Sequence, residues 1–99
     1  MSSKVSVIEK TKIKIKEPKK YKVVMFNDDF TSMEFVVFVL MNIFNKNNDE
    51  AVNIMMKVHK GGKAIVGVYS YDIAKSKVDK TMGLAREEGF PFKVVVEEA

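Results

Sequence analysis

The chain has 99 residues, of which 46% are hydrophobic and 30% charged, the composition of one ordinary globular domain. It contains no cysteine and a single histidine, which excludes disulfides, thiolate metal sites and Cys/His catalysis. Residues 1–20 hold seven lysines and two glutamates (+5), whereas residues 21–99 hold ten basic and eleven acidic residues (−1). The whole basic excess therefore lies in residues 1–20, and the slightly acidic remainder argues against a nucleic-acid interface on the folded body, although the basic end could touch phosphates.

A basic N-terminal arm over residues 1–20 and a core domain over residues 21–99 are predicted. The alternating stretch 12–16 could form a strand but has nothing evident to pair with, so we expect a mostly flexible arm. The longest unbroken apolar run, residues 35–41, is far shorter than the roughly 20 residues of a membrane span. Because no apolar stretch suited to a signal peptide follows the first lysines, we expect a soluble, cytoplasmic protein without membrane contact.

The core is predicted to begin with a strand, a loop and a helix. Residues 21–26 are rich in β-forming side chains and predict a buried strand, and residues 27–30 form the loop. Thr31 and Glu34 fit a capping box with Thr31 as N-cap, so a helix is expected over residues 32–44. Its apolar residues exceed one packing face, which predicts burial on two sides or a pocket wall. The main apolar stripe at helical spacing is Met33, Val36, Val37, Leu40 and Phe44.

Two more helices and two more strands are predicted in the second half of the chain. They are a helix over 49–60 capped by Asn48, a strand over 63–69, a helix capped by Ser70 and ending near Glu88, and a strand over 92–96. Gly61-Gly62 ends the first of these helices and Gly89 the second. The predicted fold class is α+β, with a small three-stranded antiparallel sheet packed against three helices in the order β-α-α-β-α-β.

The stretch from Asn27 to Val36 carries the first candidate site. Asn27, Asp28, Asp29 and Thr31 place an amide, two carboxylates and a hydroxyl directly before an apolar segment. Carboxylates suit an ammonium group, and an apolar wall suits a bulky side chain attached to it. The first residue of a polypeptide has both features. On these residues alone, a plain turn followed by a helix cap is the slightly favoured alternative.

His59 is the second candidate, although a lone histidine near a helix end is most often a packing or capping residue. Met55 and His59 are four residues apart and share a helix face. If that face meets the Met33–Val36 end of the preceding helix, the acids, the imidazole and an apolar cavity walled by Met33, Met55 and Val58 form one site.

Catalytic and metal-binding roles for Asp28 and Asp29 are disfavoured. Adjacent loop residues rarely flank one substrate bond from two sides, and no further oxygen ligands follow at a loop spacing suited to Mg²⁺ or Ca²⁺. Gly61-Gly62-Lys63 lacks the rest of a P-loop. We therefore expect a protein that is not an enzyme and has no metal or cofactor.

Residues 20–96 resemble the ClpS family in the order and spacing of several motifs. These are Tyr21-Lys22-Val23-Val24, Asn27-Asp28-Asp29, Thr31, Met33-Glu34-Phe35-Val36, Met55, Val58-His59 and Gly62-Lys63-Ala64. The resemblance implies an adaptor that recognises destabilising N-terminal residues (Leu, Phe, Tyr, Trp). Such an adaptor delivers proteins bearing these N-degrons to the AAA+ unfoldase ClpA or ClpC, and so indirectly to the ClpP protease.

The resemblance also implies a role for each site residue. Asn27, Asp28 and His59 would bind the α-ammonium group, and Asp29 and Thr31 would support the loop and the peptide backbone. The side-chain pocket would be lined by Val36, Val39, Met55, Val58 and Phe92. Met33 would be the gatekeeper that rejects β-branched first residues, the N-terminal arm would engage the unfoldase, and Asp72 and Lys77 would contact its N-terminal domain.

Three positions depart from the family pattern. Ser32 stands where many members have proline, Phe38 where a polar residue is common, and Phe92 where leucine is frequent, which could narrow the pocket. The arm is also richer in lysine than the family pattern suggests. Two alternatives remain: an interaction scaffold like the C-terminal domain of the ribosomal stalk protein, which would not need Asn27, Asp28 and His59 to converge, and a nucleic-acid binder using the basic arm.

Overall fold

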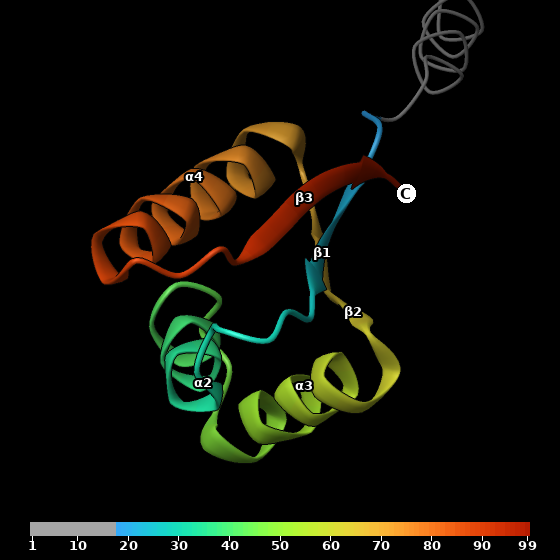
Figure 1. Cartoon of the computed structure of the whole chain (residues 1–99). Helices are drawn as coiled ribbons and strands as arrows, with labels where there is room; N and C mark the ends of the chain where they lie inside the picture. Colours follow the sequence, from blue (N-terminus) through green and yellow to red (C-terminus); the bar gives the residue numbers. More distant parts are fainter. Residues whose placement is uncertain (1–17) are drawn as a thin grey trace, which may run out of the picture.

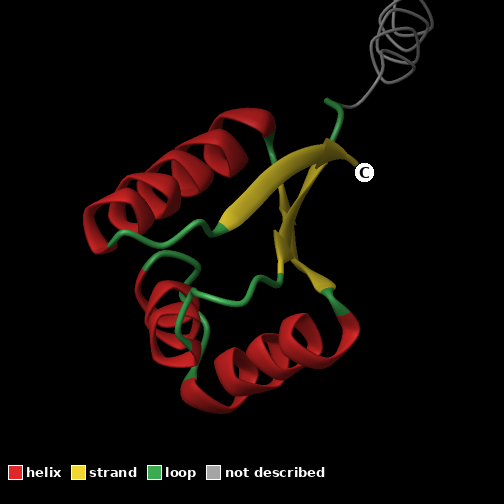
Figure 2. Cartoon of the chain, in the orientation of Figure 1, coloured by secondary structure: helices red, strands yellow, loops and turns green. Residues whose placement is uncertain are grey.

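The computed structural model describes residues 18–99, so residues 1–17 of the predicted arm lie outside the described residues. The elements are β1 (Tyr21–Phe26), α2 (Met33–Asn42), α3 (Asn48–Gly61), β2 (Lys63–Tyr69), α4 (Tyr71–Glu88) and β3 (Lys93–Glu98). Their order confirms the predicted β-α-α-β-α-β arrangement (Figure 2). The strand order is β2-β1-β3 with both pairings antiparallel, which confirms the three-stranded sheet.

The central strand β1 is the most deeply buried part of the sheet. Val23 and Met25 are fully buried in the main core cluster, which also includes Ala74, Val78 and Ala85 of α4. The helix α4 packs along the sheet (Figure 1). The helices α2 and α3 lie at the end of the sheet where the chain leaves β1 (Figure 1). This places the β1–α2 loop against both helices.

The predicted N-cap of α2 is wrong by one residue. Ser32, not Thr31, is the N-cap, and its hydroxyl oxygen accepts a hydrogen bond from the Phe35 backbone N–H at 3.1 Å. The Thr31 hydroxyl instead donates to the Asp28 carboxylate at 2.7 Å. Thr31 is therefore committed to the loop, and the next hydroxyl caps the helix.

The N-cap of α3 is also displaced by one residue from its prediction. Asn47, not Asn48, accepts from the Glu50 backbone N–H, and the Glu50 carboxylate accepts from the Asn47 backbone N–H in return. Only this register completes the reciprocal capping box. At the other end Gly62 adopts a left-handed conformation (φ 89°), which confirms the predicted glycine stop.

The buried face of α2 differs from the predicted stripe. Val36, Leu40 and Phe44 are buried as expected, but Met33 is 40% exposed. Val37 is half-buried, and Phe35 and Val39, which lie outside the predicted stripe, are buried. Phe35 packs edge-on against Phe90 and Phe92, with ring centroids 5.1 Å and 6.2 Å away. The exposed side of α2 carries Met33, Phe38 and Met41, so the helix has more apolar surface than the core covers.

The C-terminal half of the chain follows its predictions closely. Gly89 is the left-handed C-cap of α4, as predicted, and Ser70 occupies the predicted N-cap position without a side-chain cap hydrogen bond. The last strand begins at Lys93 and continues to Glu98, two residues beyond its predicted end. From residue 18 onward, no helix is long and apolar enough to cross a membrane.

Candidate functional site

The β1–α2 loop, the first turn of α2 and the C-terminal half of α3 enclose a cavity of about 380 Å³. Its lining includes most of the predicted site residues: Asn27, Asp28, Asp29, Thr31, Met33, Val36, Met55, Val58 and His59. The Asn27 backbone N–H donates to the Gly62 carbonyl oxygen at 2.8 Å, which ties the loop to the end of α3. This bond helps to bring His59, in the last turn of α3, beside the loop.

The Asp28 carboxylate organises the loop. Its Oδ1 accepts from the Phe30 and Thr31 backbone N–H groups at 2.8 Å and 2.7 Å, and its Oδ2 accepts from the Thr31 hydroxyl at 2.7 Å. Burial acts to raise the pKa of the Asp28 carboxyl, but the hydrogen bonds from Thr31 and Phe30 outweigh it and hold that pKa below its usual value. The group is therefore a carboxylate at neutral pH.

The polar side of the cavity can hold a cation. A carboxylate has about four acceptor positions, and the loop uses three of those on Asp28. Asn27 and His59 are exposed and line the same cavity, where an amide oxygen and a neutral imidazole nitrogen can each accept a further hydrogen bond. This set of acceptors matches the three N–H donors of an ammonium group.

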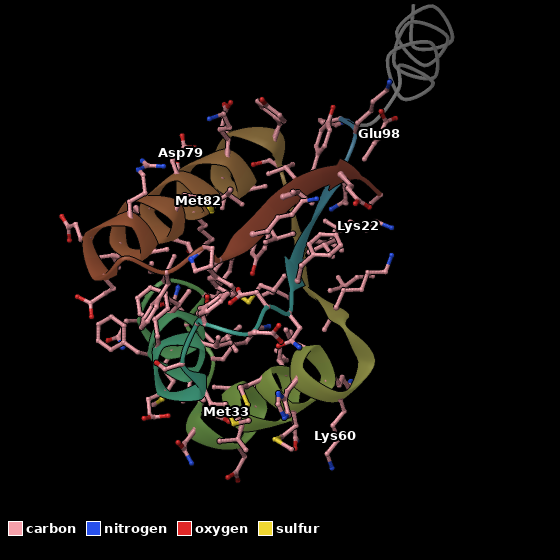
Figure 3. All side chains as sticks on the ribbon, viewed as in Figure 1. Lys22, Met33, Lys60, Asp79, Met82 and Glu98 are labelled. Carbon is pink, nitrogen blue, oxygen red and sulfur yellow. The ribbon has the colours of Figure 1, made fainter. Side chains whose placement is uncertain are left out.

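The apolar side of the cavity is smaller than predicted. Val36, Met55 and Val58 are nearly buried residues that line it. Met33 also lines it and is 40% exposed. Figure 3 shows Met33 among the side chains of the molecule. Val39 and Phe92 are buried in the core and are not part of the lining. The Phe92 ring packs against the ring of Phe35 in the core. The larger side chain at this position, phenylalanine in place of leucine, therefore fills space in the core and does not narrow the cavity.

Two residues line the cavity without having been predicted to do so. Phe30 is 74% exposed at the tip of the loop, and Ser32 borders the cavity while it caps α2. The sequence did offer an indication for Phe30, because it is a large apolar residue inside an otherwise polar loop.

The residues suggested for unfoldase contact lie on α4, away from the cavity. Asp72 is exposed in the first turn of α4. Lys77 is half-buried, and its ammonium donates to the Ile43 carbonyl oxygen at 2.6 Å and lies 5.7 Å from the ring centroids of Phe44 and Tyr69. Lys77 therefore joins α4 to the end of α2 inside the fold.

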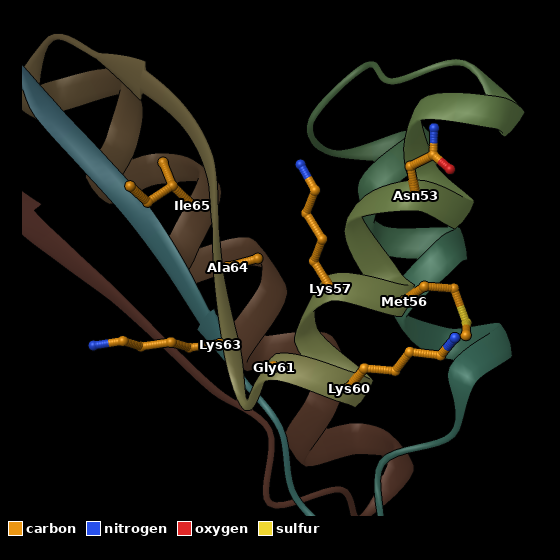
Figure 4. Close-up of a pocket in the computed structure, with 8 residues that line it drawn as sticks. All are labelled: Asn53, Met56, Lys57, Lys60, Gly61, Lys63, Ala64 and Ile65. Atoms are coloured by element: carbon orange, nitrogen blue, oxygen red, sulfur yellow. The ribbon is translucent and has the colours of Figure 1, made fainter.

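A larger cavity, of about 840 Å³, lies between α3 and the edge strand β2 (Figure 4). It includes none of the predicted site residues. Lys57 extends towards the space between the helix and the strand, whereas Lys60 and Lys63 point in different directions (Figure 4). These three charges do not converge on one point. Within residues 18–99, no three His, Cys, Asp or Glu side chains gather as metal ligands would.

Comparison with known proteins identifies the family. The family model described as "ATP-dependent Clp protease adaptor protein ClpS" matches residues 16–95. The chain is 48% identical over 89 residues to the ATP-dependent Clp protease adapter protein ClpS of Wolinella succinogenes, covering 90% of this chain and 87% of that protein. It is 47% identical over 94 residues to the ClpS protein of Paraburkholderia xenovorans, covering 95% and 90% respectively.

A solved structure agrees with the sequence comparisons. The structure of Agrobacterium tumefaciens ClpS2 bound to L-phenylalaninamide superposes with a TM-score of 0.81 at 40% identity, covering 84% of this chain and 100% of that one. Fold and sequence thus point to the same group of proteins. The chain belongs to the ClpS family of adaptor proteins of the ATP-dependent Clp protease.

Proposed function

We propose that this ClpS protein is an N-degron adaptor, which binds the first residue of a substrate protein when that residue is Leu, Phe, Tyr or Trp. The observation that carries the proposal is the cavity in which Asn27, Asp28 and His59 share one space with the apolar side chains of Val36 and Met55. A free α-amino group and a bulky side chain on the same carbon atom need such a pairing of polar and apolar walls.

The ligand of the ClpS2 structure supports this assignment. L-phenylalaninamide, the molecule bound to ClpS2, has a free α-amino group, a benzyl side chain, and an amide where the next peptide bond would be. It therefore stands for the first residue of a polypeptide. The chain described here has 40% sequence identity to that protein and the same fold.

Binding would proceed through two groups of contacts. The ammonium group donates to the remaining acceptor position of Asp28, to the Asn27 amide oxygen and to a neutral His59, and the attraction between opposite charges strengthens the bond to Asp28. The side chain enters between Val36, Met55 and Val58, where burial of its apolar surface contributes free energy in proportion to its area. N-acetylation removes the first group of contacts and leaves the second intact.

Met33 would set the specificity at the cavity mouth. It is the first residue of α2 and lines the cavity while remaining partly exposed, so its side chain lies at the entrance. A β-branched first residue carries an extra group close to its backbone and would collide there. Rejection of Val and Ile thus rests on a repulsive contact as well as on the attractive contacts to other residues.

Delivery to ClpA or ClpC would use parts of the chain far from the cavity. The chain enters β1 at Tyr21, which pairs with Glu98, whereas the cavity begins after Phe26 at the other end of the strand. Six strand residues span about 20 Å. An unfoldase could therefore grip the N-terminal arm without touching the bound residue. Asp72 offers an exposed contact on α4, whereas Lys77 is engaged within the fold.

Calorimetric titration tests the proposal with three ligands: a Phe-initiated peptide, the same peptide with an acetylated N-terminus, and an oligonucleotide. We expect binding of the first and at least tenfold weaker binding of the second, because a charged hydrogen bond contributes about 1.5–3 kcal/mol. Equal affinity for the two peptides would reject recognition of the amino group. Binding of the oligonucleotide alone would favour the nucleic-acid alternative, and binding of none would favour the scaffold.

A further inference from the structure

An apolar groove runs along the exposed side of α2, next to the candidate site. It has a volume of about 490 Å³, and its apolar lining is formed by Met33, Val37, Phe38 and Met41 of α2 with Met55 of α3. Phe38 is 51% exposed and Met41 38% exposed. Large apolar side chains gathered on a surface in this way are typical of a binding surface.

The groove is continuous with the cavity of the candidate site. Met33 and Met55 line both spaces, so the cavity and the groove adjoin at these two side chains. Met33 comes from the first turn of α2, where that helix meets α3 (Figure 3). A chain that leaves the cavity across Met33 therefore reaches the groove directly.

The length of the groove corresponds to a few residues of extended chain. Met33, Val37 and Met41 occupy successive turns of α2 and span about 12 Å at 1.5 Å per helical residue. An extended peptide advances about 3.3 Å per residue, so three or four residues cover this length. Alternate side chains of such a peptide point in opposite directions, and only every second one can face the groove.

We propose that this groove binds an apolar side chain at the second or the third residue of the polypeptide whose first residue occupies the cavity. The inference rests on the proposed function and adds a second element of substrate recognition to it. Three methionines and a phenylalanine form an adaptable apolar wall that accepts Leu, Met or Phe without a fixed shape. Because side chains alternate, one of the two positions contributes and the other does not.

The test compares three Phe-initiated peptides that differ at two positions. One has Ser at residues two and three, one has Leu at residue two, and one has Leu at residue three. We expect Leu at one of these positions to tighten binding about tenfold relative to Ser, which corresponds to partial burial of one leucine side chain. In the variants Phe38→Gln and Met41→Gln this ratio should fall towards one, with thermal melts showing that each variant is folded.

Ile73→Gln is the matched control, because Ile73 is a 50% exposed apolar helix residue on α4. This variant should keep the parental Leu-to-Ser ratio. If the Ser peptide binds but Leu brings no gain at either position, the groove inference is overturned and the proposed function stands. A gain that persists in both Gln variants overturns it equally, because the leucine then binds elsewhere.

Two further outcomes separate the remaining possibilities. Failure of all three peptides to bind overturns the proposed function together with the inference. An unchanged Leu-to-Ser ratio in Phe38→Gln, accompanied by weaker binding of this variant to a Clp unfoldase, would assign the groove to the unfoldase and overturn the inference.

Discussion

Replacing Asp28 with Asn separates the role of this side chain in the loop from the ammonium-binding role proposed for it. The amide oxygen of Asn can still accept from the Phe30 and Thr31 backbone N–H groups, as Oδ1 does at 2.8 Å and 2.7 Å. The negative charge is lost. Since a hydrogen bond to a charged group contributes about 1.5–3 kcal/mol, we expect Asp28→Asn to weaken Phe-peptide binding roughly tenfold to a hundredfold by calorimetry. The loop should keep its conformation, and any fall in the melting temperature should be smaller than that of Asp28→Ala.

Asp28→Ala and Thr31→Val serve as comparisons. Ala removes all three hydrogen bonds of the carboxylate, so we expect it to lower the free energy of unfolding as well as the affinity, by about 0.5–1.5 kcal/mol per bond. Val keeps the shape of Thr31 and removes only the hydroxyl that donates to Asp28 Oδ2, so it should lower stability by about 1 kcal/mol with a smaller loss of affinity. If Asp28→Asn binds the Phe peptide as tightly as the parent, the charge of Asp28 does not hold the ammonium and the reasoning fails.

Four other changes test separate parts of the account. Met33→Ala should admit Val- and Ile-initiated peptides, and a variant that still rejects them in a competition assay would place the gate elsewhere. Ser32→Pro removes the N-cap hydrogen bond, which costs about 1 kcal/mol, but the φ of −70° at Ser32 suits proline, and proline restricts the unfolded chain. Because these effects oppose each other, the melting temperature should shift by no more than about 8 °C. Affinity should fall above about pH 8 as the ligand amine loses its proton, and equal affinity at about pH 7 and about pH 10 would show that the ammonium charge is not recognised. Deleting residues 1–18 should leave peptide binding nearly intact and abolish degradation of an N-degron substrate by a Clp protease, whereas full-rate degradation would exclude the arm from delivery.

The lowered pKa of Asp28 adds a stability effect with a defined sign. A carboxyl whose pKa is lower in the folded state contributes stability above its ordinary value of 3.8 and loses this contribution as the pH falls through the lowered value. Asp28→Asn should therefore reduce the acid sensitivity of the melting temperature below that pH. It should have no such effect near neutrality.

The sequence predicted the elements well because local patterns determine them. Gly62 and Gly89 ended helices in a left-handed conformation that favours glycine, β-forming side chains located β1, and alternation located β2. The N-caps of α2 and α3 were each displaced by one residue, because the choice depends on contacts between side chains. At α2, the Asp28 carboxylate takes the Thr31 hydroxyl and leaves Ser32 to cap. The N-cap preferences of threonine and serine are too similar to decide between Thr31 and Ser32.

The candidate site was predicted less completely than the fold. Asn27, Asp28 and His59 lie around one cavity as expected, since they sit at the ends of elements whose positions were predicted. The resemblance placed Val39 and Phe92 in the pocket wall, but both are buried in the core and do not line the cavity. For Val39 the sequence could not show this, because α2 is apolar on nearly every side. The excess of apolar residues in α2 predicted a second buried side or a pocket wall, but the sequence did not locate the groove beside Phe38.

A crystal structure of this protein with L-phenylalaninamide would test the central claim most directly. We expect the α-amino nitrogen within hydrogen-bond distance, about 3 Å, of the Asp28 carboxylate, with Asn27 and His59 as its other neighbours. The phenyl ring should lie against Val36, Met55 and Val58. A ligand bound with its amino group away from Asp28, or bound instead in the cavity between α3 and β2, would contradict the account.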